Sequence, residues 1–284
     1  MAPTVIFRPD YLIIGHLTRD KAPDGFTLGG TCAYAGLTAH KLGKRVAVVT
    51  SYGPDIPSLA PLDGIQIENI PHPAATTFEN VYEIGQRRQK CLTIAAPLSF
   101  DHVPPAWQKA PVVHLAPLVQ EISPAACAFF EDSLLCVTGQ GWLRGRESDG
   151  NIILAPHPEL KAWLSRIDIL VLSLNDLSGD RSAMISLLTT VRLGVETLGP
   201  GGCNIYHQGR TTLVPVKSEV EVDPTGAGDI FAAAFFIKYH ETGNFIRAAE
   251  FANACAALSV RKVGLESIPD LAEIEAHRTL LYGR

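Results

Sequence analysis

Charged residues are scarce in this sequence. Asp, Glu, Lys and Arg make up 19% of its 284 residues, below the roughly 25% that is usual for soluble proteins. Because 46% of the residues are hydrophobic, the chain does not have the charge-rich, apolar-poor composition of a disordered protein. This balance favours strands that are buried on both faces. The net charge of −5 offers no positive field to nucleic acid or to an anionic membrane, so we expect neither partner.

Long hydrophobic runs and clustered metal ligands are also lacking. No run approaches the ~18 apolar residues that cross a bilayer, and the segment after Met1 lacks the basic and apolar regions of a secretory signal. The cysteines include no Cys-x-x-Cys pair and the nine histidines show no ligand spacing, which argues against a zinc cluster or a disulfide framework. We therefore expect a cytoplasmic protein whose six cysteines are reduced core thiols: Cys32, Cys91, Cys127, Cys136, Cys203 and Cys255.

Short apolar runs alternate with helical stretches along most of the chain. The predicted strands are 11–14, 46–49, 112–115, 134–137 and 169–172, and the predicted helices are 31–42, 124–131, 158–165 and 180–190. Strands that alternate with helices indicate βαβ units and a mostly parallel sheet. Nearer the C-terminus, a β-like region at 214–222 precedes two Ala-rich stretches, 225–239 and 245–263, that predict helices.

Two segments interrupt this alternation. Residues 18–29 are polar and contain a Pro-Asp-Gly break, and residues 75–96 have the alternating, β-branched and aromatic pattern of a β-hairpin that turns at Gly85-Gln86. Antiparallel strands inserted into an α/β chain predict a small lid. Arg87, Arg88 and Lys90 on this hairpin could reach a ligand, or they could be solvated charges that protect an edge strand.

The clearest chemical signal is the stretch Asp223-Pro224-Thr225-Gly226-Ala227-Gly228-Asp229. Its small residues let the backbone approach a ligand closely, and N–H groups at a helix N-terminus bind anions. Asp229 in the first helical turn could accept a proton from a hydroxyl while those amides hold developing negative charge. The alternative is a glycine turn whose acidic residue stabilises the helix dipole.

This stretch resembles the signature of PfkB-type carbohydrate kinases, the ribokinase-like family. The stretch from Leu28 to Ala35, with its Gly29-Gly30 pair, resembles the N-terminal Gly-Gly motif of the same family, and the order and spacing agree from Gly15 to about Pro269. The resemblance implies a three-layer α/β/α fold with a mostly parallel central sheet and a small β lid. It also implies one kinase domain over residues 1–284, with lid segments at about 18–29 and 75–96.

The resemblance further implies an ATP-dependent transfer of a phosphoryl group to an alcohol. Asp229 matches the general base of the family, and the amides of Gly226, Ala227 and Gly228 match its anion hole. Mg²⁺ would arrive with the nucleotide, and a monovalent cation is a further candidate. The residues implied on the nucleotide side are Ser173, Asp176, Thr197, Gly199, Gly202, Thr225, Gly226, Gly228 and Asn253.

Three of these positions keep a second interpretation. Ser173 and Asp176 stand where the family has an Asn-x-x-Glu motif that organises Mg²⁺, but Asp176 could instead cap a helix. The segment 197–202 could be a tight turn between strands. Asn253 could line an adenine pocket or lie on a helix surface.

On the acceptor side the resemblance implies Asp20, Gly29, Gly30, Tyr34, Gln140, Arg144 and Asp229. Tyr34 stands where many sugar kinases of the family have Asn, which disfavours ribose. The stretch from Gln140 to Arg144 is similar to one in myo-inositol kinases, and an amide with an aromatic side chain suits a cyclic polyol. We therefore expect an inositol kinase. The alternatives are a nucleoside, ribose or fructose kinase of the same family, or a non-catalytic sugar-binding sensor. A homodimer through the lid is a further expectation.

Overall fold

A nine-stranded sheet forms the centre of the molecule. The computed structural model describes residues 6–83, 86–217 and 219–283. The sheet contains β1 (Tyr11–Ile14), β4 (Val46–Tyr52), β5 (Gln66–Pro71), β8 (Val112–Leu115), β9 (Leu134–Thr138), β12 (Ile169–Ser173), β13 (Leu193–Thr197), β14 (Cys203–His207) and β15 (Arg210–Val214). Their order is β15-β14-β13-β12-β9-β8-β1-β4-β5; β14 pairs antiparallel with both β13 and β15, and the other neighbouring strands pair in parallel. The prediction of a mostly parallel sheet is confirmed.

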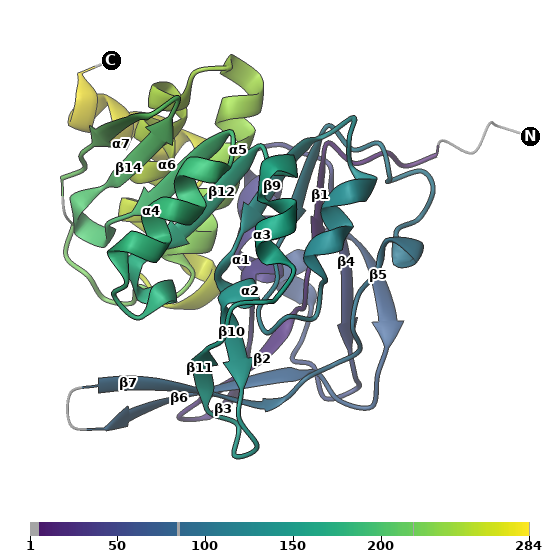
Figure 1. The fold of residues 1–284 in the computed structure, drawn as a ribbon. Coiled ribbons are helices and arrows are strands. Elements are labelled where there is room, and N and C mark those ends of the chain that lie inside the picture. Colours follow the sequence, from purple (N-terminus) through teal and green to yellow (C-terminus); the bar gives the residue numbers. More distant parts are fainter. Residues whose placement is uncertain (1–5, 84–85, 218, 284) are drawn as a thin grey trace, which may run out of the picture.

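Helices cover both faces of this sheet (Figure 1). One face packs against α1 (Thr31–Lys41), α5 (Ala227–Thr242), α6 (Phe245–Ser259) and α7 (Leu271–Tyr282), and the other against η3 (Pro124–Phe129), α3 (Leu160–Trp163) and α4 (Arg181–Thr190). Neighbouring strand residues alternate between the two layers, since Ile13 belongs to the first core cluster and Leu12 to the second. Both residues are fully buried, so the predicted three-layer α/β/α architecture is confirmed.

Shorter helical turns connect these elements. They are α2 (Gln140–Leu143), η1 (Ala60–Leu62), η2 (Phe100–His102), η4 (Leu164–Arg166), η5 (Leu174–Leu177), η6 (Gly199–Gly201) and η7 (Gly264–Ser267).

A second sheet of four strands lies at the carboxyl end of β1 (Figure 1). Its order is β3-β2-β6-β7, from β2 (Thr18–Ala22), β3 (Gly25–Gly29), β6 (Thr76–Glu83) and β7 (Gln86–Thr93). The two segments that interrupt the α/β alternation therefore build one sheet, which we call the lid sheet. The 18–29 segment is itself a β-hairpin. The predicted turn at Gly85-Gln86 begins outside the described residues.

A third hairpin ties the lid sheet to the rest of the chain. It consists of β10 (Arg144–Arg146) and β11 (Ile152–Leu154), which pair antiparallel. The Arg146 side chain donates hydrogen bonds to the carbonyl oxygens of Cys91 (2.6 Å) and Leu92 (3.2 Å) on β7. The Cys91 N–H in turn donates to the Gly150 carbonyl oxygen at 2.8 Å. Strand β7 is thus anchored by backbone and guanidinium contacts.

Three predicted elements differ from the structure. The predicted β-like region at 214–222 is wrong beyond Val214, because Pro215 has no N–H to extend the ladder and the Val222 N–H bonds instead to the Val260 carbonyl oxygen (2.7 Å). The predicted helix at 124–131 is the 3₁₀ helix η3, which Pro124 starts. The predicted helix at 158–165 begins two residues later, as α3, and continues directly into the 3₁₀ helix η4.

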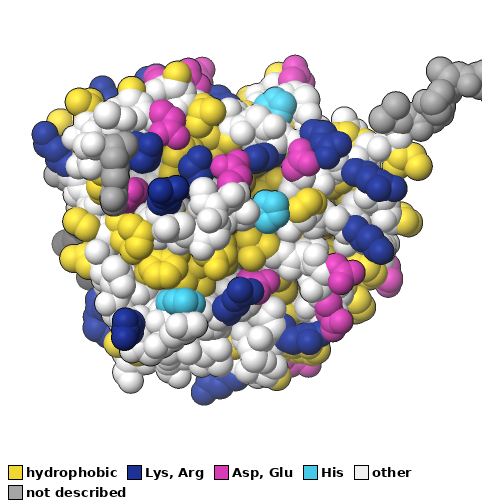
Figure 2. Space-filling model, turned by 90° about the horizontal axis from the view of Figure 1, so that it is seen from above, with side chains coloured by type: hydrophobic (Ala, Val, Ile, Leu, Met, Phe, Trp, Pro, Cys, Tyr) yellow, Lys and Arg dark blue, Asp and Glu magenta, His cyan; other side chains and the backbone are white. Residues whose placement is uncertain are grey.

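The six cysteines are buried and carry free thiols, and burial raises the pKa of each one. Among the described residues, no helix is long and apolar enough to cross a membrane. Figure 2 shows the face opposite the lid sheet, where Lys and Arg side chains are interspersed with Asp and Glu around a group of hydrophobic ones. The charges on this face are therefore mixed in sign.

Candidate functional site

The site lies at the carboxyl ends of the parallel strands. The strand order reverses at β1: the next strand in sequence to join the central sheet, β4, lies on one side of it, and the later strand β8 lies on the other. Ligands of open α/β sheets bind at such points. Three cavities open there. The lid cavity (230 Å³) lies under the lid sheet, the helix cavity (640 Å³) runs along α6, and the hairpin cavity (450 Å³) borders β10 and β11.

The lid cavity brings together most of the residues predicted on the acceptor side. Asp20, Gly30, Tyr34, Gln140, Arg144 and Asp229 all line it. They come from β2, the start of α1, α2, β10 and α5, which are far apart in the sequence. Gly29 lies directly behind this wall, because a Cβ atom there would overlap the Asp20 carboxylate. That carboxylate also accepts a hydrogen bond from the Thr18 hydroxyl at 2.7 Å.

The Asp229 carboxylate stands at the start of α5 and is half-buried at the floor of the lid cavity. The Thr31 hydroxyl donates a hydrogen bond of 2.8 Å to its Oδ1 atom. Burial raises the pKa of Asp229 to about 6, while the Thr31 hydrogen bond and the charge of Arg144 lower it and the charges of Asp176 and Asp20 raise it. Asp229 is therefore a carboxylate that changes charge near neutral pH.

The backbone before Asp229 is only partly available to an anion. Gly226 has a φ of 77°, which favours glycine, and a Cβ atom there would overlap the Tyr34 ring. The Ala227 N–H donates to the Pro224 carbonyl oxygen (3.2 Å), so one of the three predicted anion-hole amides already has a partner. Gly228 faces open space: apart from its chain neighbours and the backbone of its own helix, no described atom lies within 4 Å of the position that its Cβ would occupy.

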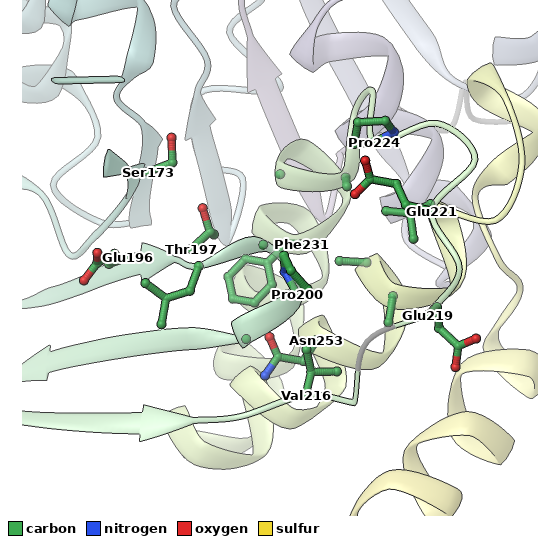
Figure 3. A pocket seen from close by; sticks show the side chains of 18 of the residues that line it. Ser173, Glu196, Thr197, Pro200, Val216, Glu219, Glu221, Pro224, Phe231 and Asn253 are labelled. Carbon is green, nitrogen blue, oxygen red and sulfur yellow. The ribbon is translucent and has the colours of Figure 1, made fainter. Parts of the chain in front are cut away.

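The helix cavity contains most of the residues predicted on the nucleotide side: Ser173, Thr197, Gly199, Gly202, Gly228 and Asn253. In Figure 3, Ser173, Glu196 and Thr197 lie at the strand ends on one side of this cavity, and Asn253, Phe231 and Val216 lie around another part of it. Thr225 and Gly226 line the lid cavity instead, and Asp176 lines the hairpin cavity. The predicted nucleotide set is therefore divided among three neighbouring cavities.

Two of the three alternative interpretations describe real contacts, and the one for Asn253 is wrong. The Ser173 N–H and hydroxyl both donate to Asp176 Oδ2 (2.8 and 3.0 Å), so Asp176 caps η5. Asn253 does not lie on a helix surface, because its side chain is buried and donates to the Val214 carbonyl oxygen (3.0 Å) and the Tyr282 hydroxyl (3.3 Å). The 197–202 segment does turn between the antiparallel strands β13 and β14. These contacts hold the cavity wall in place, and they leave a ligand role as a prediction.

One wall of the helix cavity is apolar. Val216, Ala256, Ala257 and Val260 line it together with Phe231. Lysine and glutamate side chains also border the cavity, at Lys217, Glu219 and Glu221.

An ion pair between an exposed arginine and a buried glutamate lies at another part of the same cavity. The Arg181 guanidinium is 3.1 Å from Glu196 Oε1, and Glu196 is fully buried. Its Oε2 atom accepts hydrogen bonds from Asn204 and Tyr206, both of 2.9 Å. These contacts fix a carboxylate at the end of β13.

The cavities are connected through shared wall residues. Pro224 and Gly228 line both the lid cavity and the helix cavity. Gln89 and Arg144 line both the lid cavity and the hairpin cavity. Asp229 thus lies at the junction where a ligand from the helix cavity could meet one from the lid cavity. No cluster of three or more His, Cys, Asp or Glu side chains in the described ranges could hold a metal ion.

Several wall residues were not predicted. Asn80 and Gln89 line the lid cavity from the paired strands β6 and β7, where Gln89 Nε2 donates to Asn80 Oδ1 at 3.4 Å. The strand period could have indicated Asn80, since it lies two residues after Phe78, which lines the same cavity. Glu196 could have been noticed as a carboxylate inside an apolar strand. The Arg87 and Arg88 side chains lie outside the described part. The backbone of Lys90 forms an isolated antiparallel β-bridge with that of Asn151.

Comparison with solved structures defines the class of fold. A pyrophosphate-dependent kinase in the ribokinase family, complexed with a pyrophosphate analog and myo-inositol, is similar with a TM-score of 0.76 and 18% identity, over 90% of this chain and 98% of that one. An Arabidopsis thaliana ribokinase complexed with ribose and ATP is similar with a TM-score of 0.73 and 19% identity, over 96% and 99% of the two chains. The chain therefore has the ribokinase-like α/β fold.

Sequence comparison finds similarity to one family over part of the chain. Residues 149–271 match the family model described as pfkB family carbohydrate kinase. Fructokinase-1 of Zea mays is 33% identical over 93 residues, which are 30% of this chain and 29% of that protein. An ATP-dependent ribose-1-phosphate kinase of Halopiger xanaduensis is 44% identical over 78 residues, 28% and 26% of the two chains. These matches span less than a third of either relative. The matched segment, residues 149–271, is therefore similar to part of a PfkB family carbohydrate kinase.

Proposed function

We propose that this protein transfers a phosphoryl group from ATP to a hydroxyl of a small polyol or sugar, with myo-inositol as the first acceptor to test. The observation that carries the proposal is the position of Asp229, at the junction that Pro224 and Gly228 form between the lid cavity and the helix cavity. An acceptor in one cavity and a donor in the other would meet beside one carboxylate and one helix N-terminus. Such positioning supplies much of the catalysis in phosphoryl transfer.

The proposed reaction uses Asp229 as the general base. Asp229 accepts the hydroxyl proton as the acceptor oxygen bonds to the γ-phosphorus, and the bond between that phosphorus and the β-phosphate oxygen breaks. The positive end of the α5 dipole and the amides around Gly228 stabilise the negative charge that develops. With a pKa of about 6, Asp229 is mostly ionised above pH 7 and remains basic enough to take a proton.

The helix cavity supports a nucleotide as the donor. Pyrophosphate has no apolar surface. This cavity, in contrast, has an apolar wall that includes Val216 and Val260, and it continues to the junction at Gly228. A nucleobase would lie on that wall and its phosphates would point toward α5. Mg²⁺ bound to the phosphates would offset their charge. Asp176 Oδ2 already accepts two hydrogen bonds from Ser173, so only its other oxygen remains for a metal-bound water.

The lid cavity supports a cyclic polyol as the acceptor. Its wall combines amides and carboxylates, from Asp20, Asn80 and Gln140, with the rings of Tyr34 and Phe78. Polar groups of this kind bind hydroxyls around the rim of a ring, and aromatic side chains pack on its C–H faces. In this proposal the lid sheet closes over the acceptor and excludes water, which limits wasteful hydrolysis of the donor.

A coupled assay of ADP release tests the proposal. The screen offers inositols, ribose, fructose and nucleosides as acceptors with ATP, and a parallel phosphate-release assay replaces ATP with pyrophosphate. We expect turnover with ATP and a polyol, and a loss of about 10²–10⁴-fold in kcat for Asp229→Asn with nearly unchanged ligand binding. Turnover of the variant equal to that of the wild type would rule out this mechanism. Tight acceptor binding without any turnover would indicate a sensor instead.

A further inference from the structure

The Thr31 hydroxyl has a different partner from the other threonine of α1. Thr38, seven residues further along the helix, is buried and donates to the Tyr34 carbonyl oxygen at 2.7 Å, which is the usual bond of a helical Thr to the residue four positions before it. Thr31 is the first residue of α1, so no earlier helical turn offers it a carbonyl. Its hydroxyl instead reaches Asp229 on α5, 198 positions away in the sequence, at 2.8 Å.

This contact is enclosed by the fold. Thr31 is 0% exposed, so water does not compete for its hydroxyl. A carboxylate has two oxygen atoms that can each accept hydrogen bonds, and Thr31 occupies Oδ1. Because Asp229 lines the lid cavity, the second oxygen remains for a ligand there. Thr31 also follows Gly30 directly, and both residues line the same cavity.

We propose that Thr31 is the positioning residue of the base: its hydroxyl fixes the rotamer of Asp229 and directs Oδ2 toward the acceptor hydroxyl. This inference rests on the proposed function, because it assigns a partner to the base of that reaction. Thr31 touches neither the proton nor the phosphoryl group. It acts through Asp229, by limiting the orientations of a side chain that must face the acceptor within hydrogen-bond distance.

The same hydrogen bond affects the charge of the base. A donor to a carboxylate favours the ionised form, so the Thr31 contact lowers the pKa of Asp229 against the effect of burial. The other charged or titratable groups that interact with Asp229 are Asp20 on β2, Arg144 on β10, Asp176 on η5, Tyr11 on β1, and Cys32 and Tyr34 on α1. Burial raises the pKa values of Tyr11, Cys32 and Tyr34, so these three groups stay protonated when Asp229 titrates.

The sign of the expected effect follows from this. Without the Thr31 hydroxyl, the ionised carboxylate loses a donor and its pKa rises. The acidic limb of the kcat/KM profile, which reports ionisation of the base in the free enzyme, then moves to higher pH. A hydrogen bond to a charged group contributes about 1.5–3 kcal/mol, which corresponds to a shift of roughly one to two pH units as an upper range.

The test compares the pH dependence of kcat/KM in three variants. Thr31→Val keeps the shape of the side chain and removes the donor, and we expect its acidic limb to move up by about one pH unit, with kcat lower by about 10-fold even on the plateau. Thr31→Ser restores the donor and should restore the wild-type profile. Thr38→Val removes a buried hydroxyl from the same helix without touching Asp229, and its profile should match the wild type. An unmoved limb in Thr31→Val overturns the inference, as does an equal shift in Thr38→Val.

A second measurement does not depend on activity. The carboxyl carbon of Asp229 can be titrated by ¹³C NMR in the wild type and in Thr31→Val, or in Thr31→Ala if the valine variant folds poorly. A higher pKa in the variant supports the contact, and equal values overturn it. Because this titration needs no acceptor, it separates the two proposals. If no acceptor is phosphorylated, the kinase function fails, while the NMR result still decides the role of Thr31.

Discussion

Replacement of Gly226 by alanine is the sharpest test of the geometry around Asp229, the proposed base. Gly226 has a φ of 77° and precedes α5. An added Cβ atom would overlap the Tyr34 ring, which is 5% exposed and has little room to move. Left-handed backbone costs a non-glycine residue about 1–2 kcal/mol, and forced packing in a filled interior costs about 1–3 kcal/mol. We expect Gly226→Ala to lower the free energy of unfolding by roughly 2–5 kcal/mol, a large part of a typical total.

Chemical denaturation of matched variants measures this effect. Gly228→Ala is the control, because Gly228 lies within α5 and nothing stands within 4 Å of its Cβ position. This variant should unfold at a denaturant concentration equal to or slightly above that of the wild type. A methyl group at the cavity junction should nevertheless lower its turnover. When Tyr34 is also replaced by alanine, the overlap with its ring is absent. Gly226→Ala should then lower the free energy of unfolding only by the cost of the left-handed backbone. Equal stabilities of Gly226→Ala and Gly228→Ala would refute the reasoning.

Two further predictions concern the lid and the charge of the base. Arg146→Ala removes two hydrogen bonds to β7, so amide hydrogen exchange in β7 should become faster and the KM for the acceptor should rise severalfold; exchange as slow as in the wild type would contradict the anchoring role. Because the pKa of Asp229 is raised to about 6, the folded state binds its proton more tightly than the unfolded chain, and stability is lost as the pH rises from about 4 to 6. The unfolding free energy of Asp229→Asn minus that of the wild type should therefore increase by up to about 2 kcal/mol when the pH is raised from 4 to 8. A difference between the two proteins that does not change with pH would contradict this.

The sequence predicts the layers of this fold because local patterns decide them. Apolar runs such as 11–14 and 169–172 become strands with both faces covered. The polar stretch at 18–29 does not show its partners in the same way, because β2 pairs with β6 and the register depends on a segment more than 50 residues away. Prolines also limit prediction where they end a ladder, as at Pro215.

Prediction of the site has a similar limit. The Asp223 to Asp229 stretch is contiguous and its chemistry follows from residue type and spacing. Thr31 gives no such signal, because a threonine at a helix start is common and its contact with Asp229 exists only after α1 and α5 pack together. Asn80 enters the lid cavity through strand pairing, which the hairpin pattern predicts only in outline.

The two cavities that meet near Asp229 are built mainly by two separate stretches of the chain. The lid sheet comes wholly from residues before position 94, whereas β12 to β15, α5 and α6, which surround the helix cavity, all come after position 168. The segment that matches the family model, 149–271, covers the second stretch and leaves out the first. In the proposed reaction, the first stretch contacts the acceptor together with Gln140 and Arg144, and the second stretch surrounds the donor. Exchange of residues 18–93 together with 140–144 between relatives should therefore transfer acceptor preference without a change of donor.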